Sequence, residues 1–318
     1  MTAALLDVLI CPRCRGRLAA AAPALRCDAC AREYPVRDGV PRFVAEVTDP
    51  IARRTRASFG YEWTHFTDWQ PSGAVNFHDY FTGLDLAGLA GARVLDGGCG
   101  MGRHARQVAQ HAGHVVAVDF SDAVETARQN VAECPNVDCV QADLFHLPLA
   151  PSTFDFVYSM GVVHHLADTD LAVRCLVQRL KPGGRLRVYV YWRHSGWKGA
   201  LLRVVSAARR ITTRLPHGVL HALSFVLSVA LWLLVVLPLR ACTALGIDAS
   251  SAPLFVYTRY PFQVLYNDQF DRFSAPLEKR YSREEASALL ARAGLEQITV
   301  TPRFGWLVDG IKPAGTAD

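Results

Sequence analysis

The sequence predicts an α/β fold built on a mostly parallel sheet. Two observations predict it: a glycine-rich turn after the first apolar run, and acidic residues at the ends of successive predicted strands. Apolar runs that indicate buried strands lie at 92–95, 114–118, 138–142 and 154–159. The first run ends at the glycine-rich residues 96–102, and helical spacing resumes directly after them. Glycine suits such a turn because a ligand can approach the backbone without meeting Cβ atoms. This strand, turn and helix are typical of a nucleotide-binding α/β unit.

Acidic residues stand at the ends of the predicted strands. Asp96 follows the first strand, Asp119 the second and Asp143 the third. Parallel strands present their carboxyl ends at one edge of the sheet, where open α/β sheets bind ligands. In dinucleotide sites, an acid after the second strand binds the ribose hydroxyls. The pattern therefore predicts a nucleotide-like cofactor along this edge.

Taken in order, these motifs resemble the class I S-adenosylmethionine-dependent methyltransferases. The motifs that carry the resemblance are Asp96 to Gly102, Asp119, Ala142-Asp143, Phe154-Asp155, His164-His165-Leu166 and Leu180-Lys181-Pro182-Gly183-Gly184. The resemblance implies a seven-stranded Rossmann-like methyltransferase sheet whose cofactor-binding core is 91–192. Gly97 departs from the family pattern, which often has a bulkier or small polar residue there. An oxidoreductase with a nicotinamide cofactor is the structural rival, but the Pro-Gly-Gly turn and the His-His-Leu segment favour methyl transfer.

The resemblance also implies which residues hold S-adenosylmethionine. Asp119 is expected to bind the ribose and Asp143 the adenine amine. The full expected set is Asp96, Gly97, Gly98, Gly100, Gly102, Asp119, Phe120, Asp143, Leu144 and Ser159.

Two histidines are candidate catalytic residues. His164 and His165 follow the fourth predicted strand, where the substrate pocket is expected to open. Either could take a proton from a hydroxyl, because imidazole titrates near neutral pH. The alternative is that they cap or pack the following helix. The sequence does not choose between the two histidines.

Length and composition fit one large domain with an attachment. The chain has 318 residues and a formal net charge of +5, which by itself is too small to indicate a nucleic-acid binder. The cysteines after Cys30 are scattered among core-like segments, a distribution typical of a reducing compartment. The N-terminus lacks the pattern of a secretory signal, so a cytoplasmic location is expected.

Residues 1–45 are predicted to form a metal-bound ribbon. Two Cys-x-x-Cys pairs are present, Cys11 with Cys14 and Cys27 with Cys30. Zinc prefers such a tetrahedral thiolate set, and a site with four protein ligands is closed to catalysis. Since so short a segment has little core, the metal is expected to supply its folding energy. The flanks resemble the ribbon related to the activator subunit of tRNA and protein methyltransferases, which implies scaffolding or substrate-side contact.

Residues 46–90 are expected to form a linker and cofactor-lid helices. An aromatic-dense stretch at 58–66 precedes the first strand of the core. In the methyltransferase class this segment often folds over the cofactor, so Tyr61 and Trp63 are candidate lid residues. The alternative is that both rings pack on the outer face of the domain.

A long insertion, 193–280, follows the fifth strand. No acidic residue occurs from Leu171 through Gly246. Residues 197–215 are predicted to form an amphipathic helix, with Arg203, Arg210 and Arg214 opposite its apolar face. The apolar face is expected to comprise Trp197, Leu201, Val204, Val205, Ala208, Ile211 and Leu215. The next segment, 219–239, is almost wholly apolar and borderline in length for a membrane span.

This composition indicates peripheral attachment to anionic lipid through 197–239, at the inner face of the membrane. The alternatives are a hairpin buried on its own domain, an interface of a homodimer, and a true span, which is topologically awkward inside a catalytic domain. If the insertion meets lipid, the neighbouring pocket is expected to receive a lipophilic or lipid-linked acceptor.

The remaining residues are expected to close the pocket and the sheet. Aromatic and polar residues at 255–280 are predicted to return over the substrate pocket as a lid. Within 281–318, Ser282 and Glu285 predict a capping box for a helix, and two last strands follow near 298–300 and 304–308.

The sequence as a whole predicts methylation of a small or lipid-linked acceptor, with oxygen favoured over nitrogen or carbon. The first alternative is an rRNA or tRNA methyltransferase that uses the ribbon for RNA contact. The basic run is interleaved with aliphatic residues and not with stacking aromatics, so nucleic acid is disfavoured. The second alternative is a non-catalytic recruiting protein, which the intact cofactor motifs disfavour.

Overall fold

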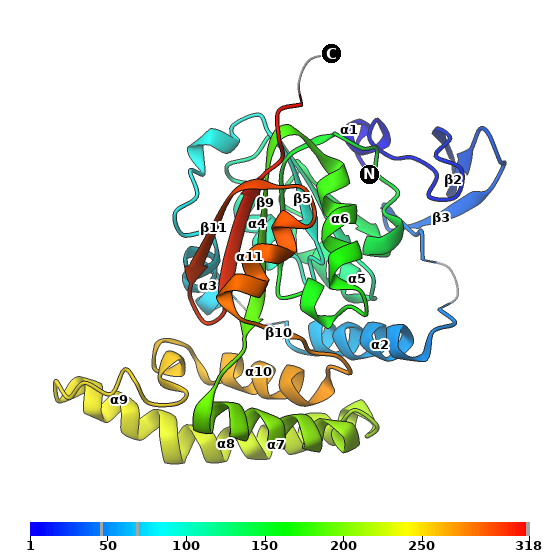
Figure 1. Cartoon of the computed structure of the whole chain (residues 1–318). Coiled ribbons are helices and arrows are strands. Elements are labelled where there is room, and N and C mark those ends of the chain that lie inside the picture. Colours follow the sequence, from blue (N-terminus) through cyan, green and yellow to red (C-terminus); the bar gives the residue numbers. More distant parts are fainter. Residues whose placement is uncertain (45–46, 68–69, 316–318) are drawn as a thin grey trace.

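The computed structural model describes residues 1–44, 47–67 and 70–315. It comprises a small N-terminal ribbon, a central α/β sheet domain and a layer of helices across one end of the sheet (Figure 1). Within the described residues the central sheet has eight strands, in the order β11-β12-β9-β8-β5-β6-β7, with β10 paired to the end of β9. The predicted α/β fold with a seven-strand path is therefore confirmed.

The strands of this sheet are β5 (Arg93–Gly97), β6 (His114–Asp119), β7 (Val137–Gln141), β8 (Phe154–Met160), β9 (Leu180–Trp192), β10 (Arg280–Tyr281), β11 (Glu296–Pro302) and β12 (Trp306–Ile311). β5 to β9 are parallel, whereas β12 runs antiparallel to both β9 and β11. Every residue of β6 is buried, because helices cover both faces of the parallel part. This explains why the strands appear in sequence as continuous apolar runs.

The helices that flank the sheet are α2 (Pro50–His65), α3 (Gln70–Phe81), η1 (Ala87–Leu89), α4 (Arg103–Val108), α5 (Ala123–Asn130), η2 (Leu144–His146), η3 (Val163–His165), α6 (Thr169–Arg179) and α11 (Arg283–Ala291). The predicted capping box is present at the start of α11, where Ser282 and Glu285 exchange side-chain and backbone hydrogen bonds.

The N-terminal ribbon (1–44) comprises α1 (Ala3–Leu6), β1 (Leu18–Ala21), β2 (Ala24–Cys27), β3 (Glu33–Arg37) and β4 (Val40–Pro41). Its end continues the central sheet, since Arg42 forms a parallel bridge with Gln141 of β7. The backbone N–H of Thr2 also donates to Asp138 of β7 at 2.9 Å. The ribbon therefore covers the free edge of β7.

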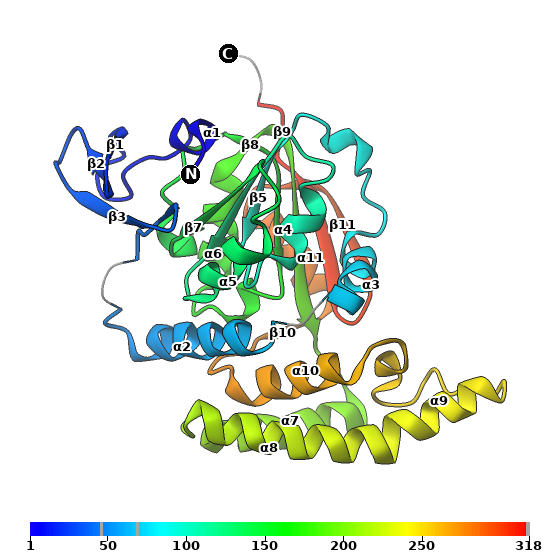
Figure 2. The ribbon, with the colours of Figure 1, turned by 180° about the vertical axis from the view of Figure 1, so that it is seen from behind.

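The insertion forms a helical layer, which comprises α7 (Gly196–Thr212), α8 (His217–Leu231), the π-helix η4 (Trp232–Val236), α9 (Leu237–Ala244), η5 (Phe255–Arg259) and α10 (Phe262–Ser274). α10 packs between α2 on one side and α7 and α8 on the other (Figure 2). β9 runs directly into this layer, so the carboxyl ends of the parallel strands point toward it.

The outer face of the helical layer is apolar and exposed. On α7, Val204 and Ile211 are 66% and 68% exposed, and on α8 Val226 is 66% exposed. In contrast, Ser224 and Ser228 of α8 are buried, and no described residue hydrogen-bonds their hydroxyls. The insertion is therefore not fully buried on its own domain: Leu220 and Val236 pack inward, whereas the apolar outer face of α7 and α8 is left uncovered.

One helix within the described residues is long and apolar enough to cross a membrane by length and composition. It spans His217–Ala244, with a mean hydropathy of 2.5 and 17% of its most apolar window buried. A single helix of this kind is weak evidence, because the core helix of a soluble protein also meets the criterion. Here the low burial sets it apart from an ordinary core helix.

Candidate functional site

A deep cavity lies where the carboxyl ends of β5, β6, β8 and β9 meet α2 and α10. One half is lined by the glycine-rich turn and by Asp119, Phe120, Asp143 and Leu144. The other half is lined by Glu62, Tyr80, His165, Tyr189, Tyr191, Asn267, Asp268, Asp271 and Leu277. We refer to these as the cofactor half and the acceptor half. The cavity occupies the edge at which open parallel sheets bind ligands.

The glycine-rich turn requires glycine for conformation and for space. Gly98, Gly100 and Gly102 have φ angles of +91°, +53° and +78°, which disfavour L side chains. A Cβ atom on Gly98 would lie 2.5 Å from a methyl carbon of Val162. Gly98 and Gly100 line the cavity, whereas Gly97 packs against α6 and Gly102 begins α4.

Asp119 is held in a fixed orientation at the end of β6. One carboxylate oxygen accepts from the backbone N–H of Gly100 at 2.8 Å, and the other accepts from the Ser121 backbone and hydroxyl at 2.8 and 2.6 Å. Burial raises the pKa of Asp119, although these hydrogen bonds partly oppose the effect. The carboxylate therefore joins the glycine turn to the end of the neighbouring strand and borders the cofactor half.

Two predicted cofactor residues contact the framework of the site and not its cavity. The Asp96 carboxylate accepts from the Tyr158 hydroxyl at 2.9 Å, and burial raises the pKa of Asp96 to about 8. The Ser159 hydroxyl donates to the Gly97 carbonyl at 2.6 Å. Asp96, Gly97, Gly102 and Ser159 therefore lie behind the cavity wall, where they hold the turn.

The two candidate lid residues have different surroundings. Trp63 lines the cavity, next to Gly100, and the Arg103 guanidinium lies 4.8 Å from its ring centroid. Tyr61 instead stacks on His65 at 3.8 Å between ring centroids and on Phe270 at 5.4 Å, outside the cavity lining. Of the two aromatic residues, only Trp63 is placed to cover a ligand.

The structure distinguishes the two candidate histidines. His165 lines the acceptor half, and its Nδ1 donates to the Leu277 carbonyl at 2.6 Å. This bond leaves Nε2 with its lone pair, and none of the described residues hydrogen-bonds it. His164 lies outside the cavity lining, with its ring centroid 4.1 Å from that of Tyr191 and tilted by 48° to it. Burial lowers the pKa of its imidazole well below the ordinary value. His165 is therefore the histidine placed to accept a proton.

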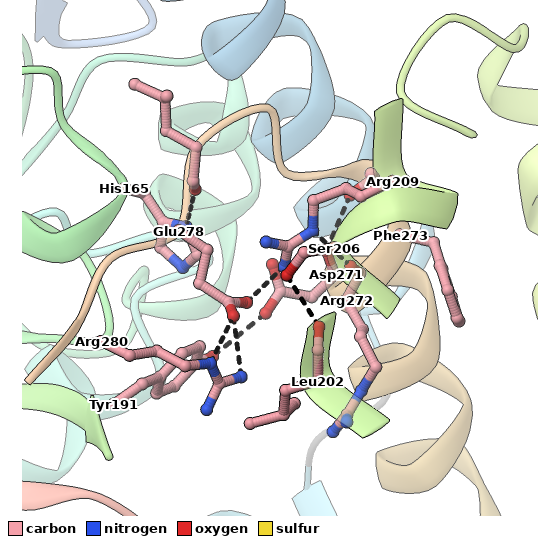
Figure 3. Close-up of polar contacts among 12 residues, drawn as sticks. His165, Tyr191, Leu202, Ser206, Arg209, Asp271, Arg272, Phe273, Glu278 and Arg280 are labelled. Atoms are coloured by element: carbon pink, nitrogen blue, oxygen red, sulfur yellow. Dashed lines mark hydrogen bonds and ion pairs between the residues drawn. The ribbon is translucent and has the colours of Figure 1, made fainter. Parts of the chain in front are cut away.

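Carboxyl groups gather in the acceptor half. Glu62, from α2, is 2% exposed; one of its oxygens accepts from the Asn267 amide, while the other has no partner among the described residues. Asp271 accepts from the Tyr191 hydroxyl at 3.1 Å, and Asp268 accepts from the Tyr257 hydroxyl at 2.6 Å (Figure 3 shows Tyr191 and Asp271).

Two of these carboxyl groups, Glu62 and Asp268, hold their protons more tightly than usual. Burial, and then the charge of Asp271, raise the pKa of Glu62 well above its ordinary value. Burial raises the pKa of Asp268 to about 6. This half of the cavity therefore offers unpaired carboxyl oxygens of Glu62 and Asp271, and burial favours the neutral form of Glu62. Such surroundings disfavour an anionic group.

The cysteines of the ribbon converge as predicted. The sulfur atoms of Cys11, Cys14, Cys27 and Cys30 all lie within 4.8 Å of one another. Sulfur ligands about 2.3 Å from a tetrahedral metal would be separated by about 3.8 Å. The Cys11–Cys30 and Cys14–Cys27 distances of 3.8 and 3.4 Å fit that geometry. The cluster is therefore suited to hold a metal ion, and its cysteines lie outside the cavity lining.

The comparisons with known proteins agree with this site. Residues 95–188 match the family model described as a methyltransferase domain, and residues 2–39 match the Trm112p-like protein model. The ubiquinone biosynthesis O-methyltransferase of Xylella fastidiosa strain M23 is 31% identical over 183 residues, which cover 54% of this chain and 72% of that protein. The chain is an S-adenosylmethionine-dependent methyltransferase.

Other relatives share smaller parts of this methyltransferase. The sterol 24-C-methyltransferase of Schizosaccharomyces pombe is 29% identical over 143 residues, 41% of this chain and 38% of that protein. The methyltransferase thus spans much less than two thirds of that relative. Human N-acetylserotonin methyltransferase, solved with S-adenosylmethionine, superposes with a TM-score of 0.50 at 16% identity over 84% of this chain and 60% of that chain. This last similarity concerns the fold alone.

Sequence reasoning missed one acceptor-half residue of the methyltransferase, Glu62, and missed that it meets two acids of the predicted return segment. Glu62 gave no signal, because a single acid in an aromatic-rich helix resembles a solvated surface residue. Asp268 and Asp271 lie in the segment expected to return over the pocket, and the structure brings their carboxyl groups beside Glu62. Glu62 is distant from them in sequence, so only the fold could show that they meet.

Proposed function

We propose that this methyltransferase O-methylates a lipophilic or lipid-linked hydroxyl acceptor at a membrane surface. The observation that carries the proposal is the shared location of two features. α10 and the segment 275–280 line or border the acceptor half of the cavity, and they belong to the insertion that also carries the exposed apolar face. A molecule partitioned into lipid would therefore meet the enzyme on the side where its pocket lies.

The cofactor half is expected to hold S-adenosylmethionine, which supplies an electrophilic methyl group. Asp119 would accept hydrogen bonds from the ribose, and Asp143, beside Phe120 and Leu144, would bind the adenine amine. Gly98 and Gly100 line this half, and glycine is needed there because a Cβ atom would crowd Val162 or Trp63. Asp96, Gly97, Gly102 and Ser159 would support the turn from behind. The ribbon cysteines are expected to hold zinc as a structural metal.

His165 is the proposed general base, with no role for His164 in proton transfer. Its Nδ1–H bond to Leu277 fixes the tautomer, so Nε2 can take the proton of an acceptor hydroxyl. In-line methyl transfer otherwise depends mainly on positioning. The unpaired oxygens of Glu62 and Asp271 would form further hydrogen bonds with the acceptor.

The names of the relatives support a lipophilic acceptor. The relatives reported above are named for ubiquinone biosynthesis and for sterol methylation. A demethylmenaquinone methyltransferase of Clavibacter sepedonicus is also 34% identical over 102 residues. Exposed Arg203, Arg210 and Arg214 beside the apolar face would favour an anionic lipid surface.

Transfer of a radioactive methyl group tests the proposal. The full-length protein is incubated with methyl-labelled S-adenosylmethionine and a bacterial membrane lipid extract, and the label in the organic phase is counted. We expect labelled product from the wild type and a loss of about 100-fold or more from His165→Gln. His164→Gln is the matched control, since its imidazole lies outside the cavity lining.

Binding of S-adenosylhomocysteine by each variant shows that the cofactor half is intact. Labelling of RNA in place of lipid would support the alternative acceptor class, and so would RNA affinity that falls steeply with salt. Equal product from His165→Gln and the wild type would remove His165 from the mechanism.

A further inference from the structure

A buried ion-pair network joins the outer helical layer to the wall of the cavity. Arg209 of α7 and Glu278 of the segment 275–280 form an ion pair, with side chains 9% and 6% exposed. The Arg209 Nε also donates to the backbone carbonyl of Arg272 at 2.9 Å, at the end of α10. We refer to Arg209 and Glu278 as the clamp (Figure 3).

The clamp continues to the acceptor half through Arg280. The second oxygen of Glu278 accepts from Arg280 at 2.7 Å, and the Arg280 guanidinium lies 5.2 Å from the ring centroid of Tyr191. Tyr191 in turn donates to Asp271. Burial alone would raise the pKa of Glu278, but the charges of Arg209 and Arg280 outweigh it and hold that pKa below its ordinary value. Glu278 therefore stays ionised and paired on both sides.

The clamp also sits next to the atom that orients His165. Leu277, whose carbonyl accepts from His165 Nδ1, immediately precedes Glu278 in the chain. A shift of Glu278 would move this carbonyl and weaken the bond that fixes the His165 tautomer. Removal of Glu278 would leave the buried Arg209 without its ion-pair partner, and removal of Arg209 would leave Glu278 paired with Arg280 alone, so the segment 275–280 depends on both clamp residues.

On α7, the clamp residue Arg209 and the exposed apolar residues lie on different faces of the helix. Arg209 is 7% exposed, whereas Val204 and Ile211, which lie on the far side of the helical turn, are 66% and 68% exposed. A surface that docks on the outer face must therefore act on the same rigid helix that holds Glu278. The Arg209–Glu278 ion pair therefore connects α7 directly to the segment 275–280.

We propose that the Arg209–Glu278 clamp transmits membrane contact at α7 to the position of His165. The proposal rests on the proposed function, because it assumes that the outer face meets lipid. Arg209 and Glu278 are positioning residues: they act through the Leu277 carbonyl and Tyr191. Docking of α7 restricts the segment 275–280 and holds His165 in the tautomer that leaves Nε2 open.

Two readouts test the clamp without a known acceptor. The first is amide hydrogen exchange of 275–281 in the full chain with S-adenosylhomocysteine, with and without vesicles of phosphatidylcholine and phosphatidylglycerol. The second is the 15N chemical shift of the His165 ring nitrogens. We expect vesicles to slow exchange in this segment severalfold in the wild type. Glu278→Gln should abolish that change and convert His165 to mixed tautomers.

Two further variants make the test specific. Arg209→Lys keeps the charge but loses the forked donor set, so it should weaken the response and provides a second route if Glu278→Gln does not fold. Glu285→Gln is the matched control, because its pair with Arg193 at 2.7 Å is exposed and outside the clamp. The control should retain the vesicle response and a single His165 tautomer.

The outcomes separate this proposal from the proposed function. Flotation of the wild type with vesicles, combined with unchanged exchange in 275–281, would overturn the clamp and leave membrane attachment standing. The clamp would also be overturned if Glu278→Gln responded like Glu285→Gln. Failure of the wild type to float would overturn both membrane attachment and its transmission through the clamp.

Discussion

At the scale of single residues, the acceptor half contains two carboxyl groups, Glu62 and Asp268, whose pKa values are raised by burial. Glu62 belongs to α2 and is hydrogen-bonded to Asn267, whereas Asp268 belongs to α10 and is hydrogen-bonded to Tyr257. An apolar or hydroxyl-bearing acceptor can enter such a chamber without electrostatic cost, whereas a carboxylate or phosphate cannot. The charge of the acceptor near its reactive atom is therefore constrained.

The raised pKa of the Asp268 carboxyl makes the free energy of unfolding depend on pH. Its folded pKa of about 6 lies above its ordinary value of 3.8, so the folded protein keeps a proton that the unfolded chain releases. Stability should fall as pH rises from about 4 to about 6, by at most about 1.4 kcal/mol per pH unit from this group. Asp268→Asn removes this contribution. The free energy of unfolding of the variant should therefore rise relative to that of the wild type between about pH 4 and about pH 6, and the difference should persist above about pH 6.

Urea unfolding at a series of pH values measures the difference. Asp248→Asn is a suitable control, because hydrogen bonds from Ser250 lower the pKa of this exposed carboxyl. Its contribution is lost only at lower pH, so this control should be flat between about pH 4 and about pH 6. A flat difference for Asp268→Asn would show that Asp268 is ionised in the folded protein.

The residues of the cofactor half were largely accessible from the sequence, because they follow strand ends and a glycine-rich turn. Asp119, Asp143 and the glycines border the cavity or support its wall as their order along the chain suggested. Glu62 and the clamp were not accessible. Arg209 and Glu278 are 69 positions apart, and an isolated charge in the sequence does not reveal its burial or its partner.

At the scale of elements, the ribbon completes an edge of the catalytic sheet. Arg42 donates to Gln141 at 3.3 Å, and the Gln141 amide donates to the Ser121 carbonyl at 3.1 Å. Ser121 in turn donates to Asp119. A continuous set of hydrogen bonds therefore links the ribbon to the residue expected to bind ribose.

Metal removal should consequently destabilise more than the ribbon. Since metal binding supplies folding free energy to a small ribbon, Cys14→Ser should lose the metal and lower the melting temperature by on the order of 5 °C. Amide exchange in β7 should also accelerate, because its covered edge is released. Cys134→Ser, outside the cluster, is the matched control. Metal content, thermal melting and exchange of 137–141 measure the effect; unchanged exchange would show that the ribbon is an independent attachment.

The elements differ in how well sequence patterns predicted them. The parallel strands were predictable, because burial on both faces leaves continuous apolar runs. The helices of the insertion were also predictable from their periodicity, but their orientation was not. An amphipathic pattern predicts which residues share a face of the helix, but it does not predict whether that face packs on the protein core or is exposed. On α8 the small polar residues face inward, which reverses the usual arrangement.

At the scale of the whole molecule, the helical layer lies across one end of the sheet domain, with the ribbon at the edge of the sheet (Figure 1). The cavity lies between the chemistry of the sheet edge and an outer apolar face. The insertion therefore contributes to both regions: α10 lines the cavity, while α7 and α8 present the exposed apolar surface. Substrate supply and catalysis would then be adjacent.

Flotation with anionic vesicles tests this arrangement as a whole. Replacement of Leu201 and Val204, which are 53% and 66% exposed, by Ser should abolish flotation, because it removes buried apolar area from the lipid contact. Arg203→Glu combined with Arg210→Glu and Arg214→Glu should reduce flotation at low salt, since only the attraction to anionic headgroups is reversed. Leu171→Ser, on α6 and 39% exposed, is the matched control and should float as the wild type does. If the wild type instead stayed with the aqueous fraction and sedimented as a dimer that Leu201→Ser dissociated, the apolar face would be a contact between two copies of the chain.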